Sequence, residues 1–237
     1  WGVQCKLNGN RCIATKDGLF TRKGERVVSC PHIERSLEPF FRLYPNAVLD
    51  GELFNEDLRQ QLNELAKLIR KTVNITKEDL KKSEKLVSYY VYDGYGFNNT
   101  QYVMDENTRY KFRKEWIEQN VQYHYIKHVK TSIVKNIDEM NVIYDDFISQ
   151  EHEGVMLRDL NSPYEHKRSK YLLKLKPDDD AEFEILDISE GSGNWSGLAK
   201  IITLKMFDGK VFDATFKGNM DEALQCLQER KKWIGKI

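Results

Sequence analysis

Several short segments of the chain combine a charged residue with a turn or a strand end in ways that suit phosphoryl chemistry. Lys6 stands between strand-like residues and the turn formed by Asn8 and Gly9. A lysine amine becomes a nucleophile toward a nucleotide α-phosphate where burial and a neighbouring cation lower its pKa from about 10.4. A metal ion on the triphosphate would be such a cation and would neutralise the leaving pyrophosphate. Taken alone, the segment is more simply interpreted as a solvated turn lysine.

Two carboxylates and a pair of lysines follow further along the chain. Glu52 comes just after a turn in a strand-like run, and Glu153 begins another short strand. Lys174 and Lys176 alternate along a predicted strand, so both ammonium groups lie on one face. Like charges on one face repel, and a phosphate chain between them would relieve that repulsion. The ordinary alternatives are an exposed hairpin glutamate and a solvated edge strand.

The apolar pattern predicts the elements that must position these residues. Apolar residues at helical spacing predict helices near 31–41, 57–72 and 137–149. A further helix is predicted to begin within residues 74–80, with Thr76 as an N-cap and Asp79 three residues later, and a charged helix is predicted at 107–119. β-branched and aromatic runs and partial alternation predict strands within 3–14, 19–22, 47–54, 86–93, 123–134, 153–158 and 171–176. Strands separated by helices in a non-repeating order predict an α+β fold rather than a doubly wound sheet.

The character of the chain changes near residues 177–181. Three strand-like runs, 181–188, 199–207 and 210–216, are separated by glycine turns and followed by a predicted helix at 221–233. The sequence therefore predicts two domains, 1–177 and a small β-rich domain at 181–237, joined by a linker near 176–181. Three strands are too few for a five-stranded barrel.

Six segments occur in the order KLNGNR, FTRKG, LDGEL, YYVYD, EGVMLR and LLKLK across residues 6–176. In this order they resemble the motifs of the covalent nucleotidyltransferases, a superfamily of ATP-dependent DNA ligases, RNA ligases and mRNA capping enzymes. Residues 181–218 are similar to the start of the OB-fold of ATP-dependent DNA ligases, and the EGVMLR and LLKLK region is similar to the small ligases of bacteriophages and large DNA viruses. The resemblance implies an adenylation domain of antiparallel sheets with flanking helices, followed by an OB-fold that is cut short.

The resemblance also implies residue roles around a nucleotide. Lys6 would carry AMP, and Glu153 would bind a catalytic metal, Mg²⁺ or Mn²⁺. Backbone groups near Gln4 and Cys5 would contact the adenine edge, and Glu52 would bind the ribose or a metal. Tyr92 and Met156 would pack on the two faces of adenine, and Lys174 and Lys176 would bind the phosphates. Arg11 would contact the ribose or the DNA 5′-phosphate.

The implied partner is nicked duplex DNA. Arg22 would hold the nick phosphate, and Lys23 would also bind DNA. Arg168 would join Lys174 and Lys176 on the phosphates and would contact DNA as well. The expected activity is ATP-dependent sealing of 5′-phosphate/3′-hydroxyl nicks through Lys6–AMP and a DNA-adenylate. Two alternatives stay open: an RNA ligase or capping guanylyltransferase, which nucleotide choice would separate, and a non-catalytic nucleic-acid-binding module.

Two features depart from the family pattern. The third position of the first motif is usually Asp, whereas here it is Asn8, which keeps the shape but not the charge. The family's last motif, a basic segment that helps to orient pyrophosphate, has no match before Ile237. We also expect that Trp1 is not the natural start of the protein.

Composition bounds the remaining possibilities. The chain has 237 residues with 37 Lys+Arg and 37 Asp+Glu, so any nucleic-acid surface must come from uneven placement of charge, as in the basic stretch 165–176. No apolar run approaches the ~20 residues of a membrane helix. The four cysteines form no C-x-x-C pair, which argues against zinc, against the NAD-dependent ligases and against a disulfide framework. We expect a cytoplasmic monomer, in the host cytoplasm if the protein is viral, without a membrane partner.

Overall fold

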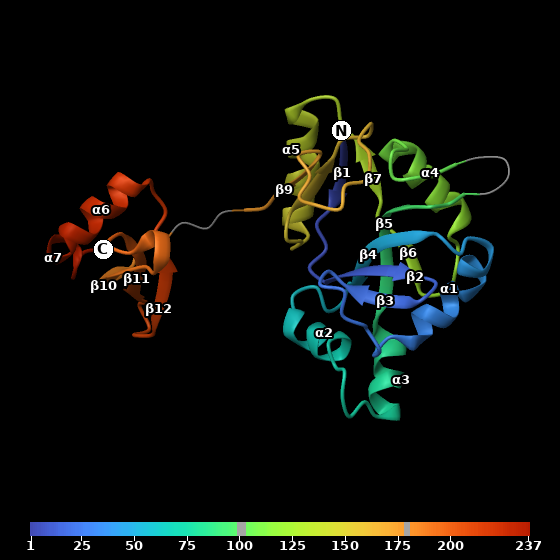
Figure 1. Cartoon of the computed structure of the whole chain (residues 1–237), viewed down its shortest axis with the longest axis horizontal. Coiled ribbons are helices and arrows are strands. Elements are labelled where there is room, and N and C mark those ends of the chain that lie inside the picture. Colours follow the sequence, from blue (N-terminus) through green and yellow to red (C-terminus); the bar gives the residue numbers. More distant parts are fainter. Residues whose placement is uncertain (99–102, 178–180) are drawn as a thin grey trace. The chain divides into compact units, whose positions relative to one another are not determined.

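The structure is a computed structural model that describes residues 1–98, 103–177 and 181–237. The chain forms two compact units, Trp1–Pro177 and Asp178–Ile237 (Figure 1). The first unit holds two β-sheets with flanking helices, and the second holds one small sheet. The α+β prediction is confirmed. Part of the predicted linker, residues 178–180, lies outside the described residues.

The larger sheet of the first unit has five strands in the order β3-β2-β4-β5-β6. They span Gly18–Thr21, Asn10–Thr15, Val48–Phe54, Ser88–Tyr95 and Ile126–His128, and only the β5–β6 pairing is parallel. Alternate residues such as Leu49 and Leu53 are fully buried. They pack against the buried face of helix α1, Pro31–Leu43, whose Ile33, Leu37 and Phe40 have no exposed surface.

Three more helices flank this sheet: α2 at Leu62–Ile69, α3 at Lys77–Leu86 and α4 at Tyr110–Asn120. Leu65 and Ile69 of α2 and Trp116 and Ile117 of α4 join the same hydrophobic core. The predicted cap of α3 is confirmed: the Thr76 hydroxyl accepts from the Asp79 N–H, and the Asp79 carboxylate accepts from the Thr76 N–H. Such a reciprocal cap satisfies two helix-end donors at once.

The smaller sheet has four antiparallel strands in the order β7-β1-β8-β9, at Thr131–Ile133, Gly2–Cys5, Val155–Arg158 and Leu172–Leu175. Helix α5, Ile137–Ser149, packs against it through Met140, which shares a second core with Val3 and Val155. The first strand of the chain is therefore central in its sheet (Figure 1).

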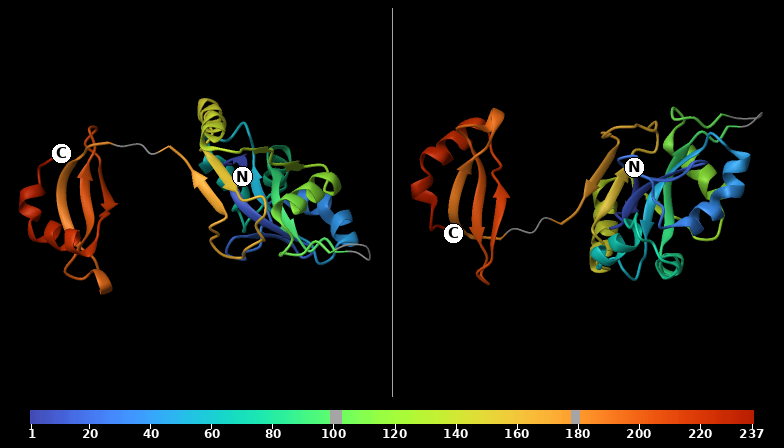
Figure 2. Two further views of the ribbon diagram at one scale, coloured as in Figure 1. Left: turned by 90° about the horizontal axis from the view of Figure 1, so that it is seen from above. Right: turned by 60° about the horizontal axis from the view of Figure 1, so that its bottom comes forward.

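The second unit is a three-stranded antiparallel sheet, β10-β11-β12, at Glu184–Glu190, Ala199–Lys205 and Val211–Thr215. A short 3-10 turn, Gly193–Trp195, precedes β11, and helices α6, Met220–Gln228, and α7, Arg230–Trp233, follow β12. Figure 2 shows both helices on one face of the sheet. The single predicted helix at 221–233 is thus two helices that meet at Glu229.

Three other predicted elements were wrong in their extent. The predicted strand at 123–134 is two short strands, because β6 pairs with β5 of the larger sheet while β7 pairs with β1 of the smaller one. The predicted helix at 57–72 begins only at Leu62, because the residues before it form a turn with i→i+3 hydrogen bonds, such as the one from the Gln61 N–H to the Leu58 carbonyl at 2.8 Å. The segment 3–14 is likewise divided by the loop at residues 6–9.

A buried ion-pair network joins the two sheets of the first unit. Asp93 of β5 accepts from Arg113 of α4 at 2.9 and 3.0 Å, and both side chains are at most 4% exposed. Arg158 of β8 also approaches Asp93, at 3.5 Å, and donates to the Gln4 side-chain oxygen at 2.8 Å. Gln4 in turn donates to the Tyr110 hydroxyl at 2.9 Å. The network links both sheets and α4 through buried polar side chains.

We predict that Asp93→Asn lowers the free energy of unfolding by about 3–5 kcal/mol, because it leaves buried guanidinium charge without its counterion. Urea denaturation measures this change in the free energy of unfolding, from the unfolding transition of the first unit. The matched control is Glu38→Gln, which breaks the exposed Glu38–Arg42 pair of α1 and should cost no more than about 1 kcal/mol. A loss of the same size in both variants would show that the network does not hold the sheets together.

Candidate active site

Lys6 lies at the end of β1, where the chain leaves the smaller sheet. Its backbone N–H donates to the Gly154 carbonyl at 2.9 Å, and its ammonium group forms an ion pair with Glu153. Gly154 has a φ of +137°, and a Cβ there would lie 2.2 Å from the Leu175 carbonyl oxygen, so only glycine fits. The structure therefore brings together the predicted nucleophile and the predicted metal ligand, from segments 147 residues apart.

The loop after Lys6 lies directly against Glu52 of the larger sheet. A Cβ on Gly9 would be 2.6 Å from the Leu53 carbonyl oxygen and 2.7 Å from Cγ of Glu52. Burial, followed by the Asp50 charge, raises the pKa of Glu52 to about 8, while the charges of Lys6 and Arg11 oppose the shift. The charge of Glu153 also acts on Glu52. The two predicted carboxylates thus share one electrostatic environment with Lys6.

Arg11 is opposite Glu52 in the β2–β4 register, but its guanidinium is bound elsewhere. It donates twice to the buried Asp50 carboxylate, at 2.9 and 2.7 Å, and the Tyr164 hydroxyl donates to the same carboxylate at 2.9 Å. This pairing raises the pKa of Arg11. Arg11 is held at the site by Asp50 while its own side chain remains 41% exposed toward a ligand.

Tyr92 occupies a β-bulge of β5. Asp50 pairs with Asp93 and Gly51 pairs with Val91, so Tyr92 is the extra residue between them. Bulges re-aim a side chain relative to the regular alternation of a strand. The Arg158 guanidinium lies 4.8 Å from the Tyr92 ring centre, and Tyr110 donates to the Tyr92 carbonyl at 3.1 Å. The ring therefore rests on the buried network.

The residues predicted at the adenine edge and the second adenine face belong to the smaller sheet. Met156 of β8 is half-buried and is opposite Gln4 on one side and Lys174 on the other. The Gln4 side chain is buried within the network, donating to Thr131 as well as Tyr110. Burial raises the pKa of the Cys5 thiol to about 12, so this thiol is protonated at neutral pH.

The predicted cations are exposed. Lys174 and Lys176 form no ion pair within the described part of the chain. Arg22 and Lys23, in the turn after β3, line a hollow of about 750 Å³ together with Arg11. Arg168 is exposed in the loop between β8 and β9 and does not line this hollow. The structure thus groups Arg11, Arg22 and Lys23 in one hollow.

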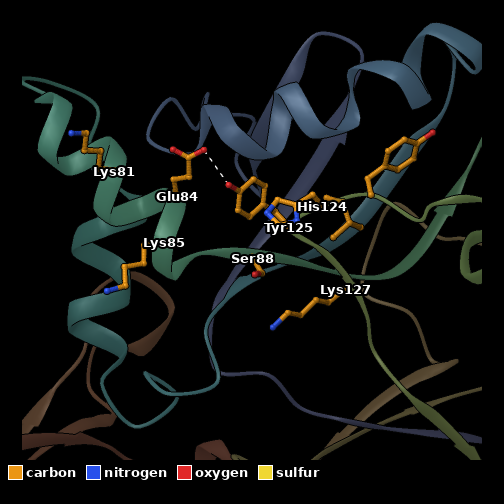
Figure 3. A pocket seen from close by; sticks show the side chains of 9 residues that line it. Lys81, Glu84, Lys85, Ser88, His124, Tyr125 and Lys127 are labelled. Carbon is orange, nitrogen blue, oxygen red and sulfur yellow. Dashed lines mark hydrogen bonds between the residues drawn. The ribbon is translucent and has the colours of Figure 1, made fainter.

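A separate hollow of about 650 Å³ lies between α3 and β6 and contains none of the predicted residues. Figure 3 shows Glu84 of α3 pointing toward Tyr125, whereas the Lys81 and Lys85 side chains extend away from it. Its charges are partly satisfied internally, because Tyr125 donates to Glu84 at 3.1 Å and Lys127 lies 5.1 Å from the Tyr90 ring centre.

Sequence reasoning missed the residues that support the site. Asp50, Asp93 and Arg158 each lie inside a quoted motif, but their roles follow only from contacts in the folded structure. Asp50 orients Arg11, and Arg158, which Asp93 accompanies, packs on the Tyr92 ring. Arg113 lies in a segment that reads as a charged surface helix. Tyr164 lies in a polar loop, where nothing in the sequence distinguishes it.

Residues 1–176 match the family model described as the ATP dependent DNA ligase domain. The chain belongs to this family. It is 29% identical over 199 residues to a DNA ligase of African swine fever virus, covering 80% of this chain and 44% of that protein. It is 26% identical to a DNA ligase of Haemophilus influenzae, covering 89% of this chain and 70% of that protein.

The fold is also that of solved ligases. A structure of a Lig E DNA ligase superposes with a TM-score of 0.69 at 19% identity, covering 94% of this chain and 79% of that one. The chain spans less than half the length of the viral relatives that it matches. No helix among the described residues is both long and apolar enough to cross a membrane.

The raised pKa of Glu52 gives a prediction about pH. Between pH 4.5 and about 8, the unfolded chain ionises Glu52 while the folded chain keeps its proton. The folded state therefore loses stability relative to the unfolded state as pH rises through this window, and the loss levels off above it. Glu52→Gln removes the effect, so its melting temperature should rise relative to that of the wild type as pH increases from 4.5 to 8.

Thermal melts across this range measure the difference between the two proteins. Glu115→Gln, on the exposed surface of α4, is the matched control and should give a difference that does not change with pH. A constant difference for Glu52→Gln as well would mean that Glu52 is ionised in the folded protein.

Proposed function

We propose that this chain is the catalytic part of an ATP-dependent DNA ligase that seals nicks in duplex DNA through Lys6–AMP. The observation that carries the proposal is the convergence of Lys6 and Glu153, from the smaller sheet, with Glu52 and Arg11, from the larger one. Family membership supports it. A lone solvated lysine would need neither the carboxylate partner nor the glycine-enforced turn at Gly154.

The proposed chemistry has three steps. The Lys6 amine attacks the α-phosphate of ATP, forming an N–P bond as the bond to pyrophosphate breaks. An oxygen of the DNA 5′-phosphate then attacks the AMP phosphorus and frees the lysine. Finally the 3′-hydroxyl attacks the 5′-phosphate and displaces AMP. In each step charge spreads over phosphate oxygens, so fixed cations carry most of the catalysis.

The nucleotide would lie between the two sheets. Tyr92 and Met156 would take the two faces of adenine, with the Arg158 guanidinium fixing the tyrosine ring from behind. Backbone groups at Gln4 and Cys5 would read the adenine edge, and Glu52 would take the ribose. Lys174 and Lys176 would bind phosphate oxygens, because they are exposed cations without a carboxylate partner among the residues described.

A divalent cation such as Mg²⁺ or Mn²⁺ fits the donor set as a substrate-bound ion. Mg²⁺ is usually held by one or two carboxylates together with substrate phosphates. Glu153 is such a carboxylate, and Glu52, which is protonated at neutral pH without an ion, would become one if the charge of the ion displaced its proton. No cluster of three metal-ligating side chains exists in the described structure. When bound, the ion would supply charge neutralisation on the phosphates. Glu153 would then exchange its Lys6 contact for the ion.

Nicked duplex DNA is the proposed partner. Arg11, Arg22 and Lys23 would hold the nick phosphate in their shared hollow, and Arg168 would contact the backbone from its loop. Residues 1–177 would be the adenylation domain. Residues 181–237, a three-stranded sheet with two helices, would be part of an OB-fold that binds the duplex.

Incubation with α-labelled ATP or GTP and Mg²⁺ tests the proposal. We expect acid-stable label on the chain from ATP and little from GTP, and complete loss of label in Lys6→Ala. Lys16→Ala, on the exposed turn after β2, is the matched control and should label like the wild type.

Other outcomes have defined meanings. Label from GTP would indicate a capping guanylyltransferase. Absence of label from both nucleotides, together with failure to seal pre-adenylylated nicked DNA, would contradict the ligase proposal and favour a binding module. Sealing of nicked RNA in preference to DNA would indicate an RNA ligase.

A further inference from the structure

A small pocket of about 160 Å³ adjoins the Lys6–Glu153 ion pair. Its remaining walls come from Asn8, the turn before α2 with Arg59 and Gln60, and the segment leading into β8. Every step proposed above moves phosphate oxygens past Lys6. Any fixed cation that lines this pocket and lacks a partner is therefore a candidate contact for phosphate.

The turn before α2 is fastened to both of its neighbours. The Gln60 side chain donates to the Glu151 carbonyl, and the Asn8 side chain donates to the Arg59 carbonyl at 3.4 Å. The second contact gives a physical reason for Asn in place of the family's usual Asp, because a carboxylate has no proton to donate and would repel the Arg59 carbonyl oxygen. Asn8 thus holds the turn that carries Arg59.

The guanidinium of Arg59 still has donors with which it could bind an anion. Within residues 1–98, 103–177 and 181–237, its side chain makes one hydrogen bond, from Nη1 to the Glu56 carbonyl at 3.3 Å. Among the same residues, its buried Nε has no hydrogen-bond partner and its guanidinium forms no ion pair. The nearby Glu56 carboxylate lies 3.5 Å from His152 instead. Buried donors without partners are rare and costly, and at a functional site they indicate a missing ligand.

We propose that Arg59 binds a phosphate group in the pocket beside Lys6 and Glu153. The inference rests on the proposed function, because that function supplies the anion. A guanidinium suits this role, since its planar fork matches two phosphate oxygens and it is charged at every working pH. The phosphate belongs either to the polyphosphate tail of ATP or to the backbone of the nicked DNA, and both present the same oxygens to Arg59.

Separate assays of the first and last steps distinguish these sources. One assay measures the rate of Lys6 adenylylation with ATP, and the other measures sealing of a pre-adenylylated nick. We expect Arg59→Gln to slow one of these steps by ~10- to 100-fold, the range for loss of a hydrogen bond to a charged group, and Arg59→Lys to recover part of the loss. Loss confined to adenylylation assigns the ATP tail, and loss confined to sealing assigns the DNA backbone.

Arg42→Gln, on the exposed face of α1, is the charge-matched control and should leave both steps unchanged. Melting temperatures show whether Arg59→Gln is folded. If it is not, the comparison is made with Arg59→Lys, whose single ammonium group cannot bind two phosphate oxygens in a fork and should still slow the affected step. Equal loss in both steps, or no loss in either, would overturn the inference.

A binding measurement separates this inference from the proposed function. Calorimetric titration of the protein with inorganic pyrophosphate requires no ligase activity. If the wild type neither labels nor seals but the Arg59→Gln variant binds pyrophosphate more weakly than the wild type, the phosphate site is supported and the ligase function is rejected. If the wild type labels and seals, and Arg59→Gln changes neither the two steps nor the affinity for pyrophosphate, the ligase function is supported and the phosphate site is rejected.

Discussion

The buried carboxylate of Asp93 is the point on which the active site depends. It belongs to the larger sheet, yet it is neutralised by Arg113 from α4 and approached by Arg158 from the smaller sheet. Buried charges are stable only with their partners in place, so this contact fixes how the two sheets meet. Arg158 also donates a hydrogen bond to the side chain of Gln4, two residues before Lys6, and lies against the Tyr92 ring. The same side chain thus links the strand before the proposed nucleophile, Lys6, to the surface proposed for adenine.

Charge balance explains how the site is prepared for a polyanion. Lys6 is paired with Glu153, and Arg11 is paired with Asp50, so these cations are oriented by carboxylates within the protein. Arg59, Lys174 and Lys176 form no such pairs among the described residues. An arriving triphosphate or DNA phosphate would therefore meet cations in two conditions: some already positioned, and others still able to form their strongest contact.

The sequence predicted the elements better than their neighbours in space. Helix α5 and the Thr76 cap were predicted closely, because both depend on local spacing. The strand at 123–134 was mispredicted because its two halves pair with different sheets, and alternation within one segment cannot reveal the partner. The same limit applies to the site. Lys6, Glu52 and Glu153 stand out by motif, whereas Arg113, Tyr164 and Arg59 act through contacts made only after folding.

The central claim is that the two sheets form one nucleotide site with Lys6 as its nucleophile. A crystal structure of the protein after incubation with ATP and Mg²⁺ tests it most directly. The account predicts AMP bonded to Nζ of Lys6, with adenine between Tyr92 and Met156 and phosphate oxygens turned toward Lys174 or Lys176. A nucleotide bound elsewhere, or AMP attached to another lysine, would contradict it.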